Sequence, residues 1–374
     1  MIFGILKESD DENRVALLPD GVDTLVKLGQ KVLIESQAGL RSFATDEEYK
    51  KVGASVVSRQ ELFQKSEFIL KINPPSGDDL DSLRSGIIFM GIFQPLFNPQ
   101  LIKALSEKKI TVLSMDTIPR TTRAQSMDVL SSMSTVTGYK SVLMAATHLP
   151  KFFPMLTTAA GTIAPAKALI LGAGVAGLQA IATSKRLGAV VEAFDTRPEV
   201  KEQVMSLGAK FIEVEGAKEA TGTGGYAIEQ SDDYKKRQLA AIQKSATKAD
   251  FIITTALIPG KKAPILITEE TVKEMKIGSV IVDLAAVNGG NCQFTEPGKT
   301  VSVHGVTIIG NTNVASTMPT DASKMYGKNI INFIKNMIKD GKPELNFEDE
   351  IISGTCICHA GTIRHTPTLQ LLEK

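Results

Sequence analysis

The stretch that decides the fold runs from Ala168 to Asp195 and reads ALILGAGVAGLQAIATSKRLGAVVEAFD. An apolar run enters a glycine-rich turn, a helical pattern follows, and a second apolar run ends at the carboxylate of Asp195. This order of strand, GxGxxG, helix, strand and acid predicts a dinucleotide-binding βαβ unit. A glycine-rich turn that binds nothing is the alternative, and the complete, ordered pattern favours the binding site.

Each part of this stretch has a physical role in holding a dinucleotide. Gly172 permits the tight turn, Gly174 lets backbone N–H groups approach the pyrophosphate, and Gly177 allows the helix to pack closely on the strand. The free N–H groups and the positive dipole end of the helix then face the phosphates. Asp195 lies 23 residues after Gly172 and is placed to accept hydrogen bonds from the adenosine ribose hydroxyls.

Composition narrows the class of protein. The 374 residues suggest two domains or one large one, and the 42 Lys plus Arg balance 41 Asp plus Glu, so no nucleic-acid partner is expected. The three cysteines favour a reducing compartment. We expect no metal site, because Cys356-Ile357-Cys358-His359 lacks the usual ligand spacing. The N-terminus has no signal-peptide pattern, and no apolar run is long enough to span a membrane.

Short apolar runs alternate with amphipathic helical patterns in two series. This alternation predicts an α/β protein of two doubly wound, Rossmann-like parallel-sheet domains. The expected strands are 3–6, 32–35, 68–72, 87–92 and 110–115 in the first series, and 168–171, 190–194, 210–214, 251–255, 279–284 and 306–309 in the second. Long helices at 124–149 and 320–339 are expected to carry the chain from the first domain to the second and back. The predicted domains are therefore 1–125 plus 330–374 and 126–329, with a nucleotide in the cleft between them.

The connection at 216–233 is unusually rich in glycine and carries a solitary tyrosine, Tyr226, beside Gly225. A long loop of this kind inside a compact α/β domain is often a lid. We expect Tyr226 to contact bound nucleotide, and an ordinary surface insertion is the alternative.

The motif from Pro119 to Ser132 reads PRTTRAQSMDVLSS and concentrates polar groups directly after the fifth strand of the first series. By itself it is compatible with a polar first turn of a helix, capped by Thr and Asp. Together with LKESDDENRVALLP, GAGVAGLQAIA, AFDTRPEVKEQV, TTALIPGK and GSVIVDLAAVNGGNC, however, it resembles the NAD(H)-binding component, domain I, of proton-translocating nicotinamide nucleotide transhydrogenases. The resemblance covers nearly the whole chain and places it in the alanine dehydrogenase/transhydrogenase superfamily.

The resemblance implies roles for individual residues. The loop residues Arg120, Gln125, Asp128 and Ser131 match the group that orients the nicotinamide and its ribose at the site of hydride transfer, and Thr121, Thr122 and Arg123 lie in the same cofactor-binding loop. Adenosine- and pyrophosphate-side contacts match Val175, Asp195, Thr196 and Arg197. Gly225 and Tyr226 match the mobile loop that closes over nucleotide, and Leu257 matches a strand end that touches the cofactor.

The resemblance also implies the reaction and the partners. Members of the family pass hydride from NADH to NADP⁺ that is held on a separate NADP(H)-binding component, and a membrane-spanning component couples this transfer to proton movement. The chain carries neither of those components, so we expect a homodimer that docks at the cytoplasmic face of the membrane through partner subunits. It is either a separate subunit or a fragment of a longer chain.

Alanine dehydrogenase is the nearest alternative function. Arg14 and Lys71 match the pair that binds the substrate carboxylate in that family. Oxidation of an amino acid also requires a proton-transfer group, and the alanine dehydrogenase pattern places a histidine in the segment that corresponds to 87–97. This chain has none there, and Asn288 replaces a second expected acid. Transfer between two nicotinamide rings needs no general acid or base, so both absences favour transhydrogenase.

An NAD-sensing module without chemistry is a second alternative. The polar loop from Arg120 to Ser131 weighs against it, because a protein that binds only adenosine needs no group that orients a nicotinamide.

Overall fold

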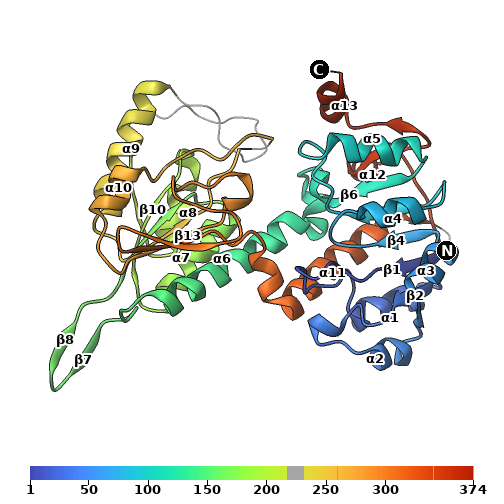
Figure 1. Ribbon diagram of the computed structural model, residues 1–374, viewed down its shortest axis with the longest axis horizontal. Coiled ribbons are helices and arrows are strands. Elements are labelled where there is room, and N and C mark those ends of the chain that lie inside the picture. Colours follow the sequence, from blue (N-terminus) through green and yellow to red (C-terminus); the bar gives the residue numbers. More distant parts are fainter. Residues whose placement is uncertain (217–230, 259, 340, 374) are drawn as a thin grey trace. The chain divides into compact units, whose positions relative to one another are not determined.

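Parallel strands alternate with helices in two units of the chain, as the computed structural model shows for residues 1–216, 231–258, 260–339 and 341–373 (Figure 1). Unit 1 comprises residues 1–133 and 316–374, and unit 2 comprises residues 134–315. The chain enters unit 2 within helix α6 (Val129–His148) and returns to unit 1 just before helix α11 (Pro319–Met337). The predicted class, a pair of doubly wound α/β domains, is confirmed.

Unit 1 is built on an eight-stranded sheet in the order β19-β18-β6-β5-β4-β1-β2-β3. The strands from β1 to β6 are parallel, and β18 and β19 add an antiparallel edge from the C-terminal segment. The strands are β1 (Ile2–Ile5), β2 (Lys31–Glu35), β3 (Ser55–Val57), β4 (Phe68–Leu70), β5 (Ile88–Gly91), β6 (Thr111–Ser114), β18 (Cys356–His359) and β19 (Thr362–Ile363). The remaining helices of this unit are α1 (Pro19–Lys27), α2 (Asp46–Lys51), α3 (Arg59–Lys65), α4 (Gly77–Ser82), α5 (Pro99–Glu107), α12 (Glu350–Thr355) and α13 (Thr366–Leu372).

Unit 2 is built on a seven-stranded sheet in the order β11-β10-β9-β12-β13-β15-β14, in which only the β14–β15 pair is antiparallel. The strands are β9 (Lys167–Leu171), β10 (Val190–Phe194), β11 (Lys210–Phe211), β12 (Phe251–Thr254), β13 (Val280–Asp283), β14 (Thr300–Val303) and β15 (Val306–Ile309). Its helices, besides α6, are α7 (Val175–Arg186), α8 (Lys201–Ser206), α9 (Asp232–Ala246) and α10 (Glu269–Glu274). Taken in chain order, its first six parallel strands lie 3-2-1-4-5-6, the order of a dinucleotide-binding sheet.

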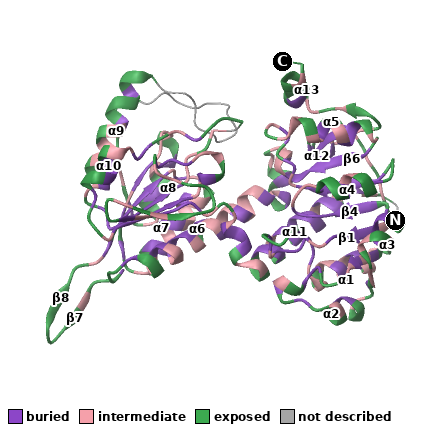
Figure 2. Ribbon diagram, in the orientation of Figure 1, coloured by how far each residue is buried: buried purple, intermediate pink, exposed green. Residues whose placement is uncertain are grey.

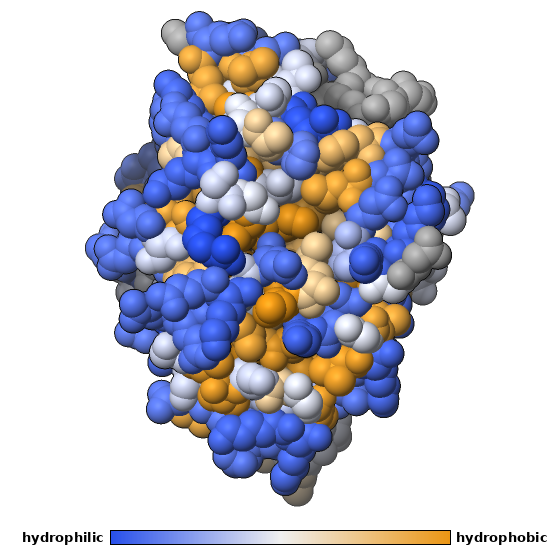
Figure 3. Space-filling view, turned by 90° about the vertical axis from the view of Figure 1, so that its right-hand side faces the viewer, coloured by the Kyte–Doolittle hydropathy of each residue, from blue (hydrophilic) through white to orange (hydrophobic). Residues whose placement is uncertain are grey.

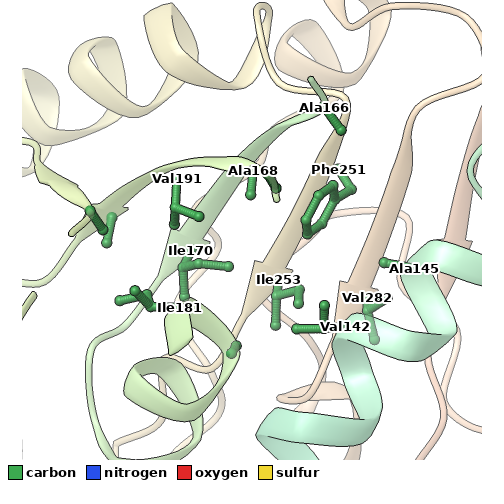
Figure 4. Close-up of a cluster of buried hydrophobic side chains, with 14 of the residues drawn as sticks. Val142, Ala145, Ala166, Ala168, Ile170, Ile181, Val191, Phe251, Ile253 and Val282 are labelled. Atoms are coloured by element: carbon green, nitrogen blue, oxygen red, sulfur yellow. The ribbon is translucent and has the colours of Figure 1, made fainter. Parts of the chain in front are cut away.

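The core of unit 2 shows why its central strands are apolar on both faces. Figure 4 shows Ile170, Ile253 and Val282 from neighbouring strands beside Val142 and Ala145 of α6. A parallel sheet is covered by helices on both faces, so its strands read as continuous apolar runs. Figure 2 accordingly shows the central strands of both sheets as buried. The packing is close, because a Cβ on Gly138 of α6 would lie 2.2 Å from the carbonyl oxygen of Ala176.

The long helix expected at 124–149 starts later than the sequence indicated. Residues Thr122–Met127 form a 3₁₀ turn, and the α-helix begins at Val129. Asp128 ends the turn and caps the helix, because its carboxylate accepts hydrogen bonds from the backbone N–H of Ser131 at 2.9 Å and from its hydroxyl at 2.6 Å. The prediction that the helix includes residues 124–128 is therefore wrong.

A β-hairpin of strands β7 (Leu156–Thr158) and β8 (Gly161–Ile163) extends from unit 2 (Figure 1). Its residues are largely exposed (Figure 2), including Thr157, Thr158, Thr162 and Ile163. A two-stranded ribbon without a covering layer is marginally stable by itself. The hairpin therefore contributes little to the hydrophobic core of unit 2.

The surface mixes polar and apolar side chains. Figure 3 shows one face of the molecule, on which hydrophobic residues gather in patches among hydrophilic ones. No helix in the described part of the chain combines the length and the apolar character that crossing a bilayer requires.

Candidate functional site

The glycine-rich turn follows the first strand of unit 2, β9. Gly172 adopts a φ of +97°, in the left-handed region that favours glycine, and a Cβ there would lie 2.4 Å from Oγ1 of Thr255. Thr255 follows β12, and its hydroxyl donates to the carbonyl oxygen of Gly172 at 3.2 Å. The turn is therefore locked to the end of the neighbouring strand, at the point where the strand order reverses.

The other two glycines have different roles. A Cβ on Gly177 would lie 1.8 Å from the carbonyl oxygen of Gly172, so only glycine lets α7 cross the turn. A Cβ on Gly174 would meet nothing closer than Nη2 of Arg197 at 3.9 Å, so the backbone is open at this position. Gly174 is the N-cap of α7 and has no side chain to occupy the first N–H groups of the helix. The geometry fits a pyrophosphate, because open backbone and free N–H groups occur together.

Asp195 follows β10, next to the turn. Its carboxylate accepts a hydrogen bond from the backbone N–H of Ala173 at 2.7 Å, which ties the acid directly to the glycine-rich turn. Arg197 binds the same carboxylate through Nε and Nη2, each at 2.9 Å. This ion pair raises the pKa of the Arg197 guanidinium. The acid that the sequence predicts for the ribose is thus in place, with an arginine already bound to it.

Two apolar side chains flank this edge of unit 2. Val175 is 42% exposed at the start of α7, and Leu257 is 39% exposed after β12. Thr196, between Asp195 and Arg197, is half-buried. Exposed aliphatic side chains beside this glycine-rich turn suit contacts with a flat base or ring. The predicted lid residues Gly225 and Tyr226 lie outside the described residues.

The predicted nicotinamide loop belongs to unit 1, where it follows β6 and leads into α6. Ala124 and Met127 are buried and anchor it, while Arg120 and Gln125 are exposed. Helix α11 holds it by its backbone, because Nδ2 of Asn329 and Nδ2 of Asn332 donate to the carbonyl oxygen of Ser126 at 2.8 and 3.0 Å. The loop is therefore a braced 3₁₀ turn that presents polar side chains outward.

The loop residues differ in what holds them. Asp128 and Ser131 bond to each other as the helix cap described above. Arg123 forms an ion pair with Asp349, the N-cap of α12, and Thr122 is exposed beside it. Thr122, Arg123 and Asp349 line an open polar hollow together with Thr121, Asn346, Glu348 and Glu350. Within the described residues, the buried Oγ1 of Thr121 finds no hydrogen-bond partner.

A second polar cluster fills the ends of β1 and β4 in unit 1. Arg14 bonds to Glu12 through Nε at 2.8 Å and Nη2 at 2.6 Å, and Nζ of Lys71 lies 3.4 Å from Asp79. Glu8 accepts a hydrogen bond from the backbone N–H of Ile72 at 2.5 Å. These side chains are all at most 7% exposed, and burial raises the pKa of Glu8 to about 7. The carboxylate-binding pair expected of an alanine dehydrogenase, Arg14 and Lys71, is therefore present and engaged by internal acids.

The three cysteines are free and buried. Burial raises the pKa of Cys356 and of Cys358 to about 12, so neither thiol ionises near neutral pH. Among the residues that the structure describes, no group of three or more His, Cys, Asp or Glu side chains is arranged to hold a metal ion.

Comparison with known proteins identifies the family. Residues 4–137 match the N-terminal domain of alanine dehydrogenase/PNT, and residues 141–366 match its C-terminal domain. The chain belongs to the alanine dehydrogenase/PNT family.

Within the family the chain is similar to transhydrogenase alpha subunits over almost its whole length. It is 46% identical over 364 residues to the first part of NAD(P) transhydrogenase subunit alpha of Rhodospirillum rubrum, covering 95% of each chain. It is 43% identical to NAD(P) transhydrogenase subunit alpha of Haemophilus influenzae, covering 96% of this chain and 71% of that one. The crystal structure of transhydrogenase from Sinorhizobium meliloti superimposes with a TM-score of 0.89 at 44% identity, covering 97% of this chain and all of the other.

Alanine dehydrogenases are more distant. The chain is 34% identical to that of Methanococcus maripaludis, over 78% of this chain and 74% of the other. The transhydrogenase alpha subunits are therefore the better guide to this chain.

The sequence did not reveal the residues that support the site. The backbone N–H of Ala173 holds Asp195, and Oγ1 of Thr255 holds Gly172. Asn291 braces the end of β12, because its side chain bonds to both the N–H and the carbonyl oxygen of Ala256. The pair Gly289-Gly290 before Asn291 is the one local signal of a tight turn there, since both glycines have positive φ.

Proposed function

We propose that this chain is the NAD(H)-binding component of a proton-translocating transhydrogenase. In this function it binds NADH and passes hydride directly to NADP⁺ held on a separate NADP(H)-binding component. A membrane-spanning component couples the transfer to proton movement. The glycine-rich turn carries the proposal. The open backbone at Gly174 and the close approach at Gly177 follow β9, and the carboxylate of Asp195 follows the neighbouring β10 and bonds to this turn.

We assign the adenosine and pyrophosphate end of NAD(H) to unit 2. The N–H groups of the turn and of the first turn of α7 suit the pyrophosphate. Asp195 suits the ribose hydroxyls, and the exposed Val175 and Leu257 suit the apolar contacts of the adenosine. Thr196 and Arg197 complete this group of contacts, with Gly225 and Tyr226 as the proposed lid.

We assign the nicotinamide end to the loop of unit 1. Gln125 and Ser131 suit directional hydrogen bonds to the carboxamide and ribose, and Asp128 fixes the orientation of Ser131. Arg120, Thr121, Thr122 and Arg123 complete the loop. Hydride transfer between two nicotinamide rings needs positioning and no general acid or base, and a braced loop supplies positioning.

An alanine dehydrogenase activity fits these residues less well. The end of β5 carries Ile92, Phe93 and Gln94 in place of a histidine, and Phe93 is fully buried. Arg14 and Lys71 already contact internal carboxylates. We therefore expect no oxidation of alanine by this chain.

The finer features of the proposal rest on the resemblance of the sequence motifs to proton-translocating transhydrogenases. We propose Re/Si-specific transfer, with regeneration of NADPH as its product. The chain is proposed to act in the cytoplasm, docked on the inner face of the inner membrane through its membrane-spanning partner. The NADP(H)-binding component is its second partner.

We also propose a homodimer, and the β7–β8 hairpin is a candidate contact. Ile163 of β8 is 44% exposed, and Met155, directly before β7, is 62% exposed. Exposed apolar groups on a projecting ribbon are typical of a surface that another chain covers. Light scattering should give about twice the chain mass of 40.2 kDa for the wild type and about one chain mass for Ile163→Asp. A wild-type mass of one chain at micromolar concentration contradicts the dimer.

Reconstitution tests the activity. The purified chain is mixed with a purified NADP(H)-binding component, and hydride transfer from NADH to NADP⁺ or to an NAD⁺ analogue is followed by absorbance. We expect transfer only when both components are present, and no NADH formation from NAD⁺ with alanine. Alanine-dependent NADH formation without the second component would support the alternative.

A further inference from the structure

The carboxylate of Asp195 is saturated with hydrogen bonds. Its Oδ1 accepts the backbone N–H of Arg197 at 2.8 Å and Nε of Arg197 at 2.9 Å. Its Oδ2 accepts the backbone N–H of Ala173 at 2.7 Å and Nη2 of Arg197 at 2.9 Å. A carboxylate offers about four acceptor positions. A ribose diol therefore cannot bond to this acid until one of the present donors leaves.

Among these donors, the guanidinium of Arg197 is the one that a side-chain rotation can remove. The two backbone donors are fixed by the glycine-rich turn and by the chain that follows β10. The Arg197 side chain is 17% exposed and the carboxylate 7%, so the guanidinium lies on the solvent side of the acid. A ligand that approaches from solvent meets the guanidinium first.

The guanidinium also lies next to the proposed phosphate site. Its Nη2 is the nearest atom to the Cβ position of Gly174, at 3.9 Å, and Gly174 caps the helix whose N–H groups face the pyrophosphate. Guanidinium binds phosphate oxygens in the same bidentate manner as it binds a carboxylate. A short movement therefore exchanges one anionic partner for the other.

We propose that Arg197 couples recognition of the ribose to recognition of the diphosphate. In the nucleotide-free protein Arg197 binds Asp195. When an adenine dinucleotide binds, the ribose diol takes the place of the guanidinium on Asp195, and the guanidinium moves to the pyrophosphate. This inference rests on the proposed binding of NAD(H) by unit 2.

The coupling makes the site specific for adenosine diphosphates. A nucleoside that lacks the diphosphate must displace the guanidinium and gives it no anion in return. Such a ligand loses a charge-assisted pair that it does not replace. Adenosine should therefore bind weakly, because its binding must break the ion pair between Arg197 and Asp195.

Calorimetry on the full chain tests the exchange with ADP, adenosine and 2′-deoxyadenosine. In Arg197→Met we expect adenosine to bind several-fold more tightly, whereas ADP should not gain, because the lost phosphate contact offsets the freed carboxylate. The preference for ADP over adenosine should therefore fall about tenfold. The preference for adenosine over 2′-deoxyadenosine should rise in the variant, because the diol then meets an unblocked carboxylate. Arg186→Met, at the exposed far end of α7, is the matched control and should change none of these affinities.

Two further variants exclude simpler explanations. Arg197→Lys keeps a charge for the phosphate and loses the bidentate contact with Asp195, so ADP should stay within a few-fold of wild type while adenosine gains. In Asp195→Asn/Arg197→Met the gain for adenosine should disappear. Thermal melts verify that each variant is folded.

The outcomes separate this inference from the proposed function. If wild type binds neither NADH nor ADP, the proposed function fails. If wild type binds both, and Arg197→Met weakens ADP and adenosine in parallel or changes neither, Arg197 is an ordinary contact or a structural residue and the exchange is overturned. A gain for adenosine without a matching gain for ADP supports it, and a loss for ADP with unchanged adenosine overturns it.

Discussion

The two sheets share one order of parallel strands but differ in the connection that follows the first strand. In unit 1 the parallel strands lie β3-β2-β1-β4-β5-β6, and in unit 2 they lie β11-β10-β9-β12-β13-β15. Both arrangements place the first strand beside the fourth, where doubly wound sheets bind ligands. In unit 2 only residues 172–174 separate β9 from α7, and the helix N-terminus meets the strand end. In unit 1 residues 6–18 separate β1 from α1.

The longer connection changes the chemistry of the strand end. It brings Glu8 onto the backbone N–H groups of Ile72 and Asn73, and it brings Arg14 together with Glu12. Unit 1 thus places buried acidic side chains at this strand end, whereas unit 2 places there the first turn of α7, whose N-cap Gly174 has no side chain. The two units therefore differ in the connection after the first strand and not in the order of their parallel strands.

The largest expected effect comes from breaking the buried charge cluster of unit 1. Arg14→Met leaves Glu12, which is 1% exposed, buried without its guanidinium. Removing one partner of a buried pair costs about 3–5 kcal/mol of unfolding free energy. Chemical denaturation should show this loss, while calorimetry at a temperature where the variant is folded should show NADH affinity within a few-fold of wild type.

The control is Lys27→Met, which removes an exposed pair with Asp23 and should cost less than about 1 kcal/mol. If Arg14→Met instead keeps its stability and loses NADH, then the strand end of unit 1 binds ligand and the contrast between the units is wrong.

A smaller effect, confined to binding, is expected at the turn of unit 2. In Gly174→Ala the new Cβ meets no atom closer than 3.9 Å, and the φ of −74° suits alanine, so stability should be unchanged. The methyl group occupies the approach of the pyrophosphate to the backbone. We expect NADH affinity to fall at least about a hundredfold, or about 2.8 kcal/mol. Gly77→Ala, where nothing lies within 4 Å, is the control that should bind NADH normally. Unchanged affinity in Gly174→Ala would exclude the turn as the phosphate site.

The raised pKa of Glu8 predicts a pH dependence for unit 1. Between about pH 4.5 and 7 the folded protein holds a proton on Glu8 that the unfolded chain releases. Folding therefore binds protons in this window, so raising the pH through it lowers the stability. Glu8→Gln cannot ionise, and between pH 5 and pH 8 it should lose about 2 kcal/mol less unfolding free energy than wild type does. The control is Glu107→Gln, an exposed position, and its stability should change with pH as that of wild type does. If Glu8→Gln also follows the wild-type profile, the carboxyl of Glu8 is already ionised at pH 5 and the prediction is wrong.

The features that the sequence predicted are those with a local cause. The turn at Gly172, the helix stop near Gly188 and the acid at Asp195 all lie within one short stretch, and each follows from the conformational freedom or charge of a single residue. The predicted strand positions rest on apolar runs, and buried parallel strands preserve that signal. The class of fold was accordingly predictable from both series of strands.

The features that the sequence did not predict depend on contacts between distant residues. Glu8 meets Ile72 from 64 positions away, so no spacing rule indicates that the strand end of unit 1 is filled. The antiparallel strand β18, near the C-terminus, pairs with β6 in the first third of the chain, so no local pattern predicts this pairing. The sequence around Asp128 is compatible with a position inside a helix or with the N-cap of a helix. The hydrogen bond from the backbone N–H of Ser131 to its carboxylate shows that Asp128 is the cap. The same ambiguity affects Arg123, whose ion pair with Asp349 is invisible in the motif.

The smallest expected effect tests whether unit 1 contributes geometry while unit 2 contributes affinity. Gln125 is exposed on the 3₁₀ turn Thr122–Met127, and buried Ala124 and Met127 on either side fix the backbone that carries it. Gln125→Asn keeps the amide and shortens the side chain by one methylene, so a hydrogen bond to the nicotinamide carboxamide becomes longer or misaligned. NADH affinity should stay within a few-fold, because the contacts around Gly174 and Asp195 form equally in the ground state and the transition state.

Hydride transfer to the NADP(H)-binding component should fall at least about tenfold, or about 1.4 kcal/mol of transition-state stabilisation, since small displacements of a reacting ring are costly. Single-turnover transfer rates and calorimetry on the same preparation measure the two quantities separately, with the neighbouring exposed Ser126→Ala as control, because Asn329 and Asn332 bond to the backbone of Ser126 and not to its side chain. A rate loss that merely matches a loss of affinity would move Gln125 to the binding contacts, and a wild-type rate would remove the loop from the site of hydride transfer.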